Sequence, residues 1–225
     1  MNFPDFQFEK SLWKKGFALV AGCDEVGRGC FAGPVVAGCV VLPSDLKIPK
    51  NIYINDSKKV TSKRREISSL WIKKNALAWG TGESSAALIN KIGISKATKR
   101  AFRLAIKNAK TRILHSGSNI DFLLIDAFYI PFVRGLRRKN QKAIIDGDEK
   151  SLTIAAASIV AKVYRDKSME KIGSRTQYKK YDWVNNKGYG TKKHQEAIKK
   201  YGLTRYHRKQ FVETFLNNSF SSQAR

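Results

Sequence analysis

The sequence predicts an α/β or α+β fold built around one central sheet. Two short valine-rich stretches near the N-terminus indicate buried strands, and longer segments with helical apolar spacing follow them. Strands that alternate with helices over 225 residues indicate a single sheet covered by helices. No repeat and no linker rich in Pro, Gly or Ser divides the chain. We therefore expect a core over residues 1–172 and a helical C-terminal region over 173–225 that does not fold independently.

The first half of the chain predicts strands around one helix. Residues 17–23 (FALVAGC) and 34–42 (PVVAGCVVL) are short, apolar and bounded by Gly or Pro, as buried strands are. Thr61 or Ser62 can cap a helix, and residues 77–84 (LAWGTGES) indicate a further strand that ends in turn residues. The apolar positions expected to form the buried face of the helix are Ile67, Leu70, Trp71 and Ala78.

The second half predicts two helices around a strand. Residues 95–114 carry one apolar stripe with Lys and Arg on the other face, and residues 121–128 (DFLLIDAF) are strand-like. Residues 151–166 are apolar all round, which indicates a buried helix, and a short helix is expected near 208–216. The stripe of the first helix consists of Ala97, Ala101, Leu104, Ala105, Ala109 and Ile113.

The charge of the chain indicates a polyanionic partner. Lys and Arg number 43 against 18 Asp and Glu, which gives a net charge of +25 and a pI near 10.1. Such a field attracts polyanions, of which nucleic acid is the commonest; a solvated surface in a basic proteome is the alternative. The cations are spread along the chain, whereas a membrane-surface protein would concentrate them on one amphipathic helix.

We expect a cytoplasmic protein, because the sequence shows no targeting signal and its cysteines are expected to be reduced. The first ten residues (MNFPDFQFEK) lack the basic and apolar regions of a secretory signal, and no apolar run reaches the roughly 18 residues needed to span a bilayer. Cys23, Cys30 and Cys39 lie in apolar contexts without the spacing of zinc ligands. We expect them to be reduced core residues.

Carboxylates follow two of the predicted strands. Asp24 and Glu25 end the first, and Asp126 ends the strand FLLID. Neighbouring strand residues point to opposite faces, so Asp24 and Glu25 can address one ion only if the backbone leaves β geometry, which Gly27 and Gly29 permit. If the two strands are neighbours, three carboxylates converge at one sheet edge, where oxygen ligands suit Mg²⁺ or Mn²⁺. Each acid alone is equally typical of a turn or a helix cap.

Several ordered blocks resemble bacterial ribonuclease HII, the type 2 ribonuclease H family. The stretch GCDEVGRGCFAGPVVAGCVVL matches the opening signature of that family, and the later blocks follow in the family's order over residues 13 to 215. D-E-x-G-R-G alone is only moderately specific, so the evidence lies in the ordered set. The later blocks are NDSKKVTSKRRE (55–66), LLIDAF (123–128), GDEKSLTIAAASIVAKVYRD (147–166), NKGYGTKKH (186–194) and HRKQF (207–211).

The resemblance implies a ribonuclease-H-like fold, with a mixed sheet and flanking helices, and a metal-dependent endoribonuclease. Such enzymes cut the RNA strand of RNA–DNA hybrids, and cut at ribonucleotides in duplex DNA, to leave a 5′-phosphate and a 3′-hydroxyl. A pair of Mg²⁺ or Mn²⁺ ions is expected, with a monomer as the simplest state. By position, the catalytic and metal-binding carboxylates are Asp24, Glu25, Asp126 and Asp148.

The resemblance also implies which residues bind the substrate. Gly27, Arg28 and Gly29 match the element that contacts ribose 2′-hydroxyls, and a 2′-hydroxyl is what distinguishes RNA from DNA. Tyr189 matches the tyrosine that senses the RNA–DNA junction. Lys58 contacts phosphate or lies on a solvated face. Arg64 has the same two alternatives as Lys58, and Tyr201 and Tyr206 are weaker candidates for the sensing role of Tyr189. His194 contacts phosphate or lies at a helix end, and the sequence favours neither.

Two positions depart from the family pattern. The family usually has Asp-Gly after the third strand, where this chain has Asp126 followed by Ala127. The usual Lys-Gly-Asp is Asp146-Gly147-Asp148 here, after a gap that is longer than usual. Asp148 is preferred to Asp146 because its distance of ten residues to Ser158 fits the AAAS block. A junction resolvase on the same fold and a non-catalytic nucleic-acid-binding module are the rival hypotheses.

Overall fold

The computed structural model describes residues 3–113 and 119–221, which form two compact units. Residue 114, the last of the helix predicted from 95, lies outside the described residues. Each unit is described by itself. The first unit consists of residues 1–26, 36–83 and 99–164, and the second of residues 27–35, 84–98 and 165–225.

The first unit contains a mixed sheet of five strands in the order β3-β2-β1-β4-β5. The central strand β1 pairs with β2 in antiparallel fashion and with β4 in parallel, and β4 pairs in parallel with β5. Every residue of β2 is buried, as its unbroken apolar run predicts. The strands are β1 (Val20–Val26), β2 (Val35–Val41), β3 (Ala78–Ser84), β4 (Phe122–Asp126) and β5 (Gln141–Ile144).

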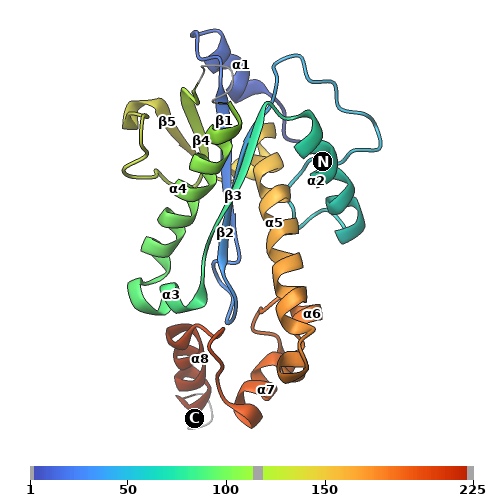
Figure 1. The fold of residues 1–225 in the computed structure, drawn as a ribbon, viewed down its shortest axis with the longest axis vertical. Coiled ribbons are helices and arrows are strands. Elements are labelled where there is room, and N and C mark those ends of the chain that lie inside the picture. The colour runs from blue at the N-terminus through green and yellow to red at the C-terminus, as the bar shows by residue number, and fades with distance from the viewer. Residues whose placement is uncertain (1–2, 114–118, 222–225) are drawn as a thin grey trace. The chain divides into compact units, whose positions relative to one another are not determined.

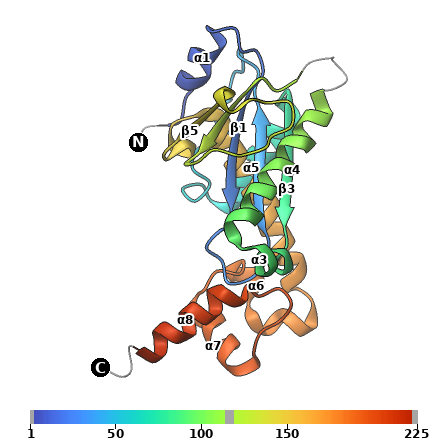
Figure 2. The same ribbon diagram turned by 90° about the vertical axis from the view of Figure 1, so that its left-hand side faces the viewer.

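Helices cover both faces of this sheet. Figures 1 and 2 show α4 on one face and α5 on the other. The predicted helices are confirmed in α2, α4 and α5, while α1 and β5 were not foreseen. The helices that lie wholly or partly in this unit are α1 (Gln7–Trp13), α2 (Ser62–Asn75), α4 (Ile94–Ile113) and α5 (Leu152–Gly173), with short 3₁₀ turns η2 (Arg138–Asn140) and η3 (Gly147–Glu149).

Glycines let the two long helices lie close to the sheet. A Cβ on Gly22 would lie 2.1 Å from the backbone carbon of Thr153, and one on Gly38 would lie 2.3 Å from the carbonyl oxygen of Ala157, both on α5. On the other face, the alanine stripe of α4 is buried as predicted and packs against glycines in β3. Small residues therefore set the spacing of the layers.

Glu9 of α1 caps the N-terminus of α5. Its buried Oε1 accepts hydrogen bonds from the hydroxyl of Ser151 at 2.7 Å, and from the backbone N–H and the hydroxyl of Thr153 at 3.0 and 2.7 Å. A carboxylate at this end of a helix satisfies N–H groups that have no partner within the helix, and it complements the helix dipole. The cap holds the first helix of the chain onto the sheet-packed end of α5.

The apolar face predicted for α2 is mostly wrong. Leu70 and Ile67 are 70% and 44% exposed, and Ala78 belongs to β3 rather than to the helix. Trp71 alone of the predicted set packs from α2 against the core, where it is partly buried. The side chains of α2 that are buried are Ser68, Ser69 and Ile72. Ser68 bonds both the N–H and the carbonyl of Tyr53, so a polar contact orients this helix where the hydrophobic pattern predicted an apolar one.

The second unit is a small helical assembly around aromatic residues. Trp183 is fully buried and stacks on Tyr178 and Tyr181. The domain boundary predicted at 172/173 stays a prediction, although this unit also takes in two earlier segments. Besides the end of α5, its helices are α3 (Ala86–Ile92), η4 (Thr176–Tyr181), α6 (Trp183–Asn186), α7 (Lys192–Tyr201) and α8 (Lys209–Ser221).

Two other expectations concern burial. Cys23, Cys30 and Cys39 are free and buried, as predicted. In the part of the chain that the structure describes, none of the helices combines the length and the apolar character needed to cross a membrane.

Candidate active site and recognition loop

The strand register brings Asp24 and Asp126 side by side. Cys23 of β1 pairs with Ile125 of β4 in a parallel ladder, so the residues that follow each of them lie at the same edge of the sheet. Asp24 lies within β1, and Asp126 is the last residue of β4. The sequence-based expectation that these two strands are neighbours is therefore confirmed.

The backbone around Asp24 and Glu25 differs from the expectation. β1 stays paired with β2 through Val26, so both acids lie in regular β geometry and leave the strand on opposite faces. The conformational change comes two residues later, at Gly27, where φ is +85°. The two carboxylates still interact, because the charge of Glu25 raises the pKa of Asp24.

Asp24 is a buried acid among other acids. Its side chain is 5% exposed, and burial, followed by the charge of Glu25, raises its pKa well above the usual value. A hydrogen bond with Ser158 of α5 opposes that shift, whereas the charges of Asp126 and Asp148 add to it. The structure thus brings Glu25, Asp126 and Asp148 within electrostatic range of Asp24.

Asp126 and Asp148 share this environment. Burial is the main cause that raises the pKa of Asp126, although its Oδ1 accepts the N–H of Gly147 at 2.8 Å. Burial raises the pKa of Asp148 to about 6, and the neighbouring charges of Asp56 and Asp126 contribute. Both acids are thus held where the charged form is disfavoured, as long as no cation offsets it.

The geometry distinguishes Asp148 from Asp146. Asp148 is buried in the 3₁₀ turn η3 and interacts with both Asp24 and Asp126. Asp146 is exposed, precedes that turn with φ +53°, and its charge acts on Asp126. This placement supports Asp148 as the fourth carboxylate.

The donor set fits a hard divalent cation in its chemistry. Carboxylate oxygens are the ligands that Mg²⁺ and Mn²⁺ prefer, and a cation would relieve the repulsion that raises the three aspartate pKa values. Among residues 3–113 and 119–221, however, no group of three His, Cys, Asp or Glu side chains is arranged as a ligand set. Asp24 and Asp126 instead accept backbone N–H groups, from Glu25 and Gly147.

The segment 55–58 contains the predicted Lys58 and adds Asp56 and Ser57, which sequence reasoning did not single out. Asp56 is buried and hydrogen-bonds Asp148, while Ser57 bonds Ser158 at 3.0 Å. Lys58 is exposed, and its charge lowers the pKa of both Asp126 and Asp148, so it lies close to the acids. The block containing these residues was recognised, and the adjacent Asp-Ser before two lysines was the available signal.

The departure at Ala127 has a structural counterpart. Ala127 adopts φ +61°, a left-handed conformation that glycine takes freely and that costs another L-residue about 1–2 kcal/mol. The glycine that usually follows this aspartate in the family would fit without strain. Here the N–H of Ala127 bonds the carbonyl of Ile144, which holds the strained residue in place.

In the second unit, residues 27–34 form a loop that we call the recognition loop. Arg208, with no exposed surface, donates hydrogen bonds to the carbonyls of Gly27 and Arg28, each at 2.7 Å, and to that of Gly33 at 3.0 Å. A trans peptide holds its N–H opposite its carbonyl, so the N–H groups of Arg28 and Gly29 point away from this buried guanidinium.

A second buried arginine braces the same loop. Arg165 donates to the carbonyls of Ala32 at 3.2 Å and Pro34 at 3.0 Å. A Cβ on Gly27 would lie 1.9 Å from its Nε, so both the positive φ and this contact require glycine. At Gly29, in contrast, a Cβ would meet nothing within 4 Å, and the side chain of Arg28 is exposed.

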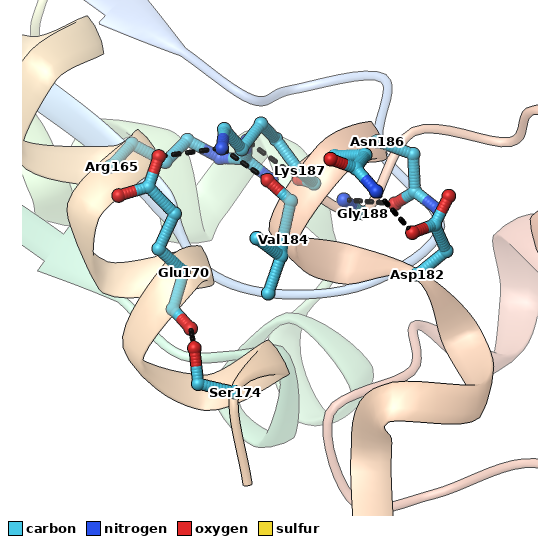
Figure 3. Close-up of polar contacts among 9 residues, drawn as sticks. Arg165, Glu170, Ser174, Asp182, Val184, Asn186, Lys187 and Gly188 are labelled. Carbon is cyan, nitrogen blue, oxygen red and sulfur yellow. Dashed lines mark hydrogen bonds and ion pairs between the residues drawn. The ribbon is translucent and has the colours of Figure 1, made fainter.

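Tyr189 follows a tight turn that Figure 3 shows in detail. Lys187 and Gly188 have φ +51° and +84°, and the N–H of Gly188 bonds Oδ1 of Asn186 at 2.8 Å. Arg165 donates to the carbonyl of Lys187 at 3.0 Å, and the ammonium of Lys187 bonds Glu170 at 2.6 Å. Polar contacts to α5 therefore fix the turn that presents the tyrosine.

Tyr189 joins this turn to the recognition loop. The carbonyl of Gly188 accepts the N–H groups of Phe31 and Ala32, at 2.9 and 3.1 Å. The Tyr189 side chain is 40% exposed, and burial of its remainder, followed by the charge of Cys30, raises its pKa to about 12. The structure thus brings Tyr189 together with the predicted Gly-Arg-Gly element.

His194 is a core residue. It is fully buried at the start of α7, its Nδ1 lies 2.8 Å from the carbonyl of Tyr189, and its Nε2 accepts from Trp183 at 3.0 Å. His207 lies 3.2 Å from the same Nε2, and burial lowers the pKa of both histidines. The helix-start alternative for His194 matches this placement, and the histidine pair anchors the backbone of Tyr189.

Solved structures share the fold. A ribonuclease HII from Archaeoglobus fulgidus, solved in complex with PCNA, aligns with a TM-score of 0.62 over 84% of this chain and 93% of its own, at 24% identity. A Bst ribonuclease HIII in complex with Mn²⁺ aligns with a TM-score of 0.70 over 89% of this chain and 70% of its own, at 15% identity. These likenesses show a ribonuclease-H-like fold.

Sequence comparisons show the family. The family model "Ribonuclease HII" matches residues 21–214. A ribonuclease HII of Caldanaerobacter subterraneus subsp. tengcongensis is 44% identical over 93% of this chain and 80% of its own length. The corresponding protein of Alkaliphilus metalliredigens is 43% identical over 93% of this chain and 98% of its own. The ordered motifs, the fold and these matches agree: the chain belongs to the ribonuclease HII family.

Proposed function

We propose that this protein is an endoribonuclease that cuts the RNA strand of RNA–DNA hybrids and cuts at ribonucleotides embedded in duplex DNA. The observation that carries the proposal is the buried group of Asp24, Asp126 and Asp148, with Glu25 next to Asp24 in β1, in a member of the ribonuclease HII family. Hydrolysis would leave a 5′-phosphate and a 3′-hydroxyl.

The four carboxylates would hold divalent cations, two Mg²⁺ or Mn²⁺ ions in the full site. Bound cations supply charge stabilisation at the phosphate and a more acidic water as nucleophile. The protein's own part is to orient the acids. The hydrogen bonds from Ser158 to Asp24 and from the N–H of Gly147 to Asp126 favour the ionised carboxylates, whereas the bond between Asp56 and Asp148 orients Asp148 but raises its pKa. Lys58 adds a positive charge near Asp126 and Asp148 that would attract the substrate phosphate.

The recognition loop would identify the ribose. Two buried arginines fix its carbonyls, so the N–H groups of Arg28 and Gly29 are oriented before substrate arrives. In the part of the chain that the structure describes, a Cβ at position 29 would meet no protein atom within 4 Å, so the fold itself does not require glycine there. A ligand that approaches the backbone closely would require it. The exposed part of Tyr189 would pack against the sugar beside the cut. These roles follow from the motif positions and remain proposals.

The rival hypotheses make different demands on these residues. A junction resolvase would use the acids but has no need of the Gly-Arg-Gly element together with Tyr189. A non-catalytic binding module has no need of all four acids, and all four are present. A monomeric state and a cytoplasmic location stay predictions. The PCNA seen with the Archaeoglobus enzyme describes that enzyme, and we propose no equivalent partner here.

The decisive experiment is cleavage of a DNA duplex that contains one ribonucleotide, with Mg²⁺ or Mn²⁺ present. Wild-type protein should cut on the 5′ side of the ribonucleotide, and Asp24→Asn should lose at least about 10³-fold in rate. Asp45→Asn, an exposed loop acid in the same unit, is the matched control and should cut normally. Absence of cutting by the wild type with every divalent cation would refute the proposal.

A further inference from the structure

The loop between β4 and β5, residues 127–140, carries an exposed and strained aromatic residue. Phe132 is 92% exposed and adopts φ +58°, a conformation that L-residues rarely take. An exposed phenylalanine in this conformation lowers the stability of the protein. Glycine would adopt the same backbone conformation without strain and would expose no apolar side chain to water. Such an outlier justifies a search for a ligand that contacts it.

The loop is held firmly on both sides of Phe132. Before it, Gln141 bonds the N–H and the carbonyl of Ile130, at 3.1 and 3.0 Å, and Phe128 packs edge-on against Phe102 of α4. After it, the carbonyl of Arg134 accepts the ammonium of Lys110 at 2.8 Å. These contacts hold the segment on both sides of Phe132 against α4.

The surroundings of Phe132 are uniformly basic. The sequence contains no acid in 127–145 and none in 99–113 of α4. Arg103 donates to the carbonyl of Pro131 at 3.2 Å, so part of this charge is tied directly to the loop. The cations of the two segments are Arg134, Arg137, Arg138, Lys139 and Lys142 on the loop side, and Lys99, Arg100, Arg103, Lys107, Lys110 and Arg112 on the helix.

A hollow of about 610 Å³ lies next to Phe132. Tyr129 and Leu136 line it with apolar surface, while Lys99 and Arg138 supply charge, and the Arg138 guanidinium lies 4.7 Å from the centre of the Tyr129 ring. Aromatic surface interleaved with cations is typical of sites that hold a nucleic-acid backbone, because the cations contact phosphates and the rings pack on sugars. An acidic peptide would match the charge but not the regular row of phosphates that the cations of the loop, together with Lys99, Arg103 and Lys110 of α4, can contact.

Chain connectivity places this surface beside the proposed catalytic site. The loop begins at Ala127, directly after Asp126 at the end of β4. A duplex bound with its cut phosphate near Asp126 continues for many base pairs, and its backbone requires cations beyond the cut itself.

We propose that the loop 127–140 and the facing part of α4 bind the sugar–phosphate backbone of the duplex beside the cut, with Phe132 packed against a sugar. The inference rests on the proposed function, because it uses the same substrate. It concerns phosphate and sugar contacts alone, so it predicts equal effects on an RNA–DNA hybrid and on an all-DNA duplex of the same sequence.

The test is equilibrium binding of both duplexes, labelled with a fluorophore and measured without divalent cations so that nothing is cut. Phe132→Gly should weaken binding of both duplexes by about tenfold. Arg137→Ala combined with Arg138→Ala should lower the slope of log Kd against log salt by about two, at roughly 0.9 per lost phosphate contact. The thermal midpoint of Phe132→Gly should not fall, because glycine relieves the positive φ.

Matched controls lie in the same unit. Leu70→Ala removes another exposed apolar side chain, and Lys14→Ala with Lys15→Ala removes two other exposed charges. Both controls should bind both duplexes as the wild type does. The inference would be overturned if both loop variants kept wild-type affinity and salt slope. It would also be overturned if the control variants lost as much affinity as the loop variants. Wild-type protein that binds normally but never cuts would count against the proposed function alone.

Discussion

The carboxylate edge of the sheet and the recognition loop solve opposite electrostatic problems. At the edge, Asp24, Asp126 and Asp148 are buried near one another and their pKa values are raised. In the loop, the buried charge is that of Arg208, and three carbonyls accept its hydrogen bonds. The first region is destabilised by its buried acids until a cation binds. The second contains its own cation, so its hydrogen bonds are formed before any ligand binds.

The largest effect is expected where the edge loses a ligand. Asp148→Asn should reduce cleavage of an RNA–DNA hybrid at least about 10³-fold, because a displaced cation loses both positioning and charge stabilisation. Asp146→Asn is the matched control, two residues away and exposed, and should keep most of the rate. The reverse pattern in an initial-rate assay would assign the fourth ligand to Asp146.

The recognition loop should lose its structure when the buried guanidinium of Arg208 is removed. Arg208→Ala leaves three buried carbonyls without their donor, and we expect a loss of about 3 kcal/mol or more in the free energy of unfolding. Arg208→Lys keeps the charge but not the planar fork, so it should recover only part of this.

A structural role alone would not change selectivity, so binding supplies the second readout. Folded Arg208→Lys should lose preference for a ribonucleotide-containing duplex over plain DNA. Arg205→Ala, which removes an exposed neighbour, should change neither quantity. Unaltered preference in folded Arg208→Lys would show that the clamp does not orient the ribose contacts.

The edge should also respond to pH in a direction opposite to that of most acids. A carboxyl group whose pKa is raised on folding binds more protons in the folded state, so it destabilises the protein when it ionises. The buried His194 and His207 have lowered pKa values and act in the opposite direction, so the measurement is the stability difference between metal-free wild-type protein and Asp148→Asn. This difference should shift in favour of the wild type as pH falls from 7.5 towards 5.5, through the value of about 6 for Asp148, and Mg²⁺ or Mn²⁺ should flatten the shift. Urea unfolding of both proteins at several pH values, with and without the ion, measures it; a difference that shifts the other way would contradict the burial of Asp148.

The smallest effect concerns the strained residue beside the edge. Ala127→Gly should stabilise the fold by about 1 kcal/mol, since glycine adopts φ +61° without a Cβ clash. Ala76→Gly is the control, because Ala76 has φ −73° and gains nothing from glycine. Denaturant midpoints compare the two, and equal destabilisation by both would remove strain at Ala127 as an explanation.

The sequence predicted four of the five strands because they have local signals. The unbroken apolar run of β2 and the acid at the end of β4 are visible without any tertiary knowledge. The buried face of α2 was only partly predictable: Trp71 packs against the core, but the contact of Ser68 with Tyr53 is polar, and Ile67 and Leu70 are exposed. Asp56 was missed for a related reason, because only the fold places it beside Asp148.

The two arginines that brace the recognition loop show the same limit. Arg165 lies in α5 directly before Asp166 and Lys167, and Arg208 immediately precedes α8. No local sequence signal marks either residue as a buried cation, since most arginines in folded proteins are exposed. Their partners are carbonyls more than 130 residues earlier in the chain, which no periodicity records.

The cap formed by Glu9 has a consequence for how the chain is made. Its hydrogen-bond partners lie 142 and 144 residues further along, so α1 emerges from the ribosome long before anything exists for it to hold. At about 5–20 residues per second, Glu9 waits roughly 7–30 seconds for Ser151 and Thr153 to be synthesised. During that interval the apolar side of the first helix is uncovered, and a nascent chain stalled before residue 150 is the species that we expect chaperones to bind.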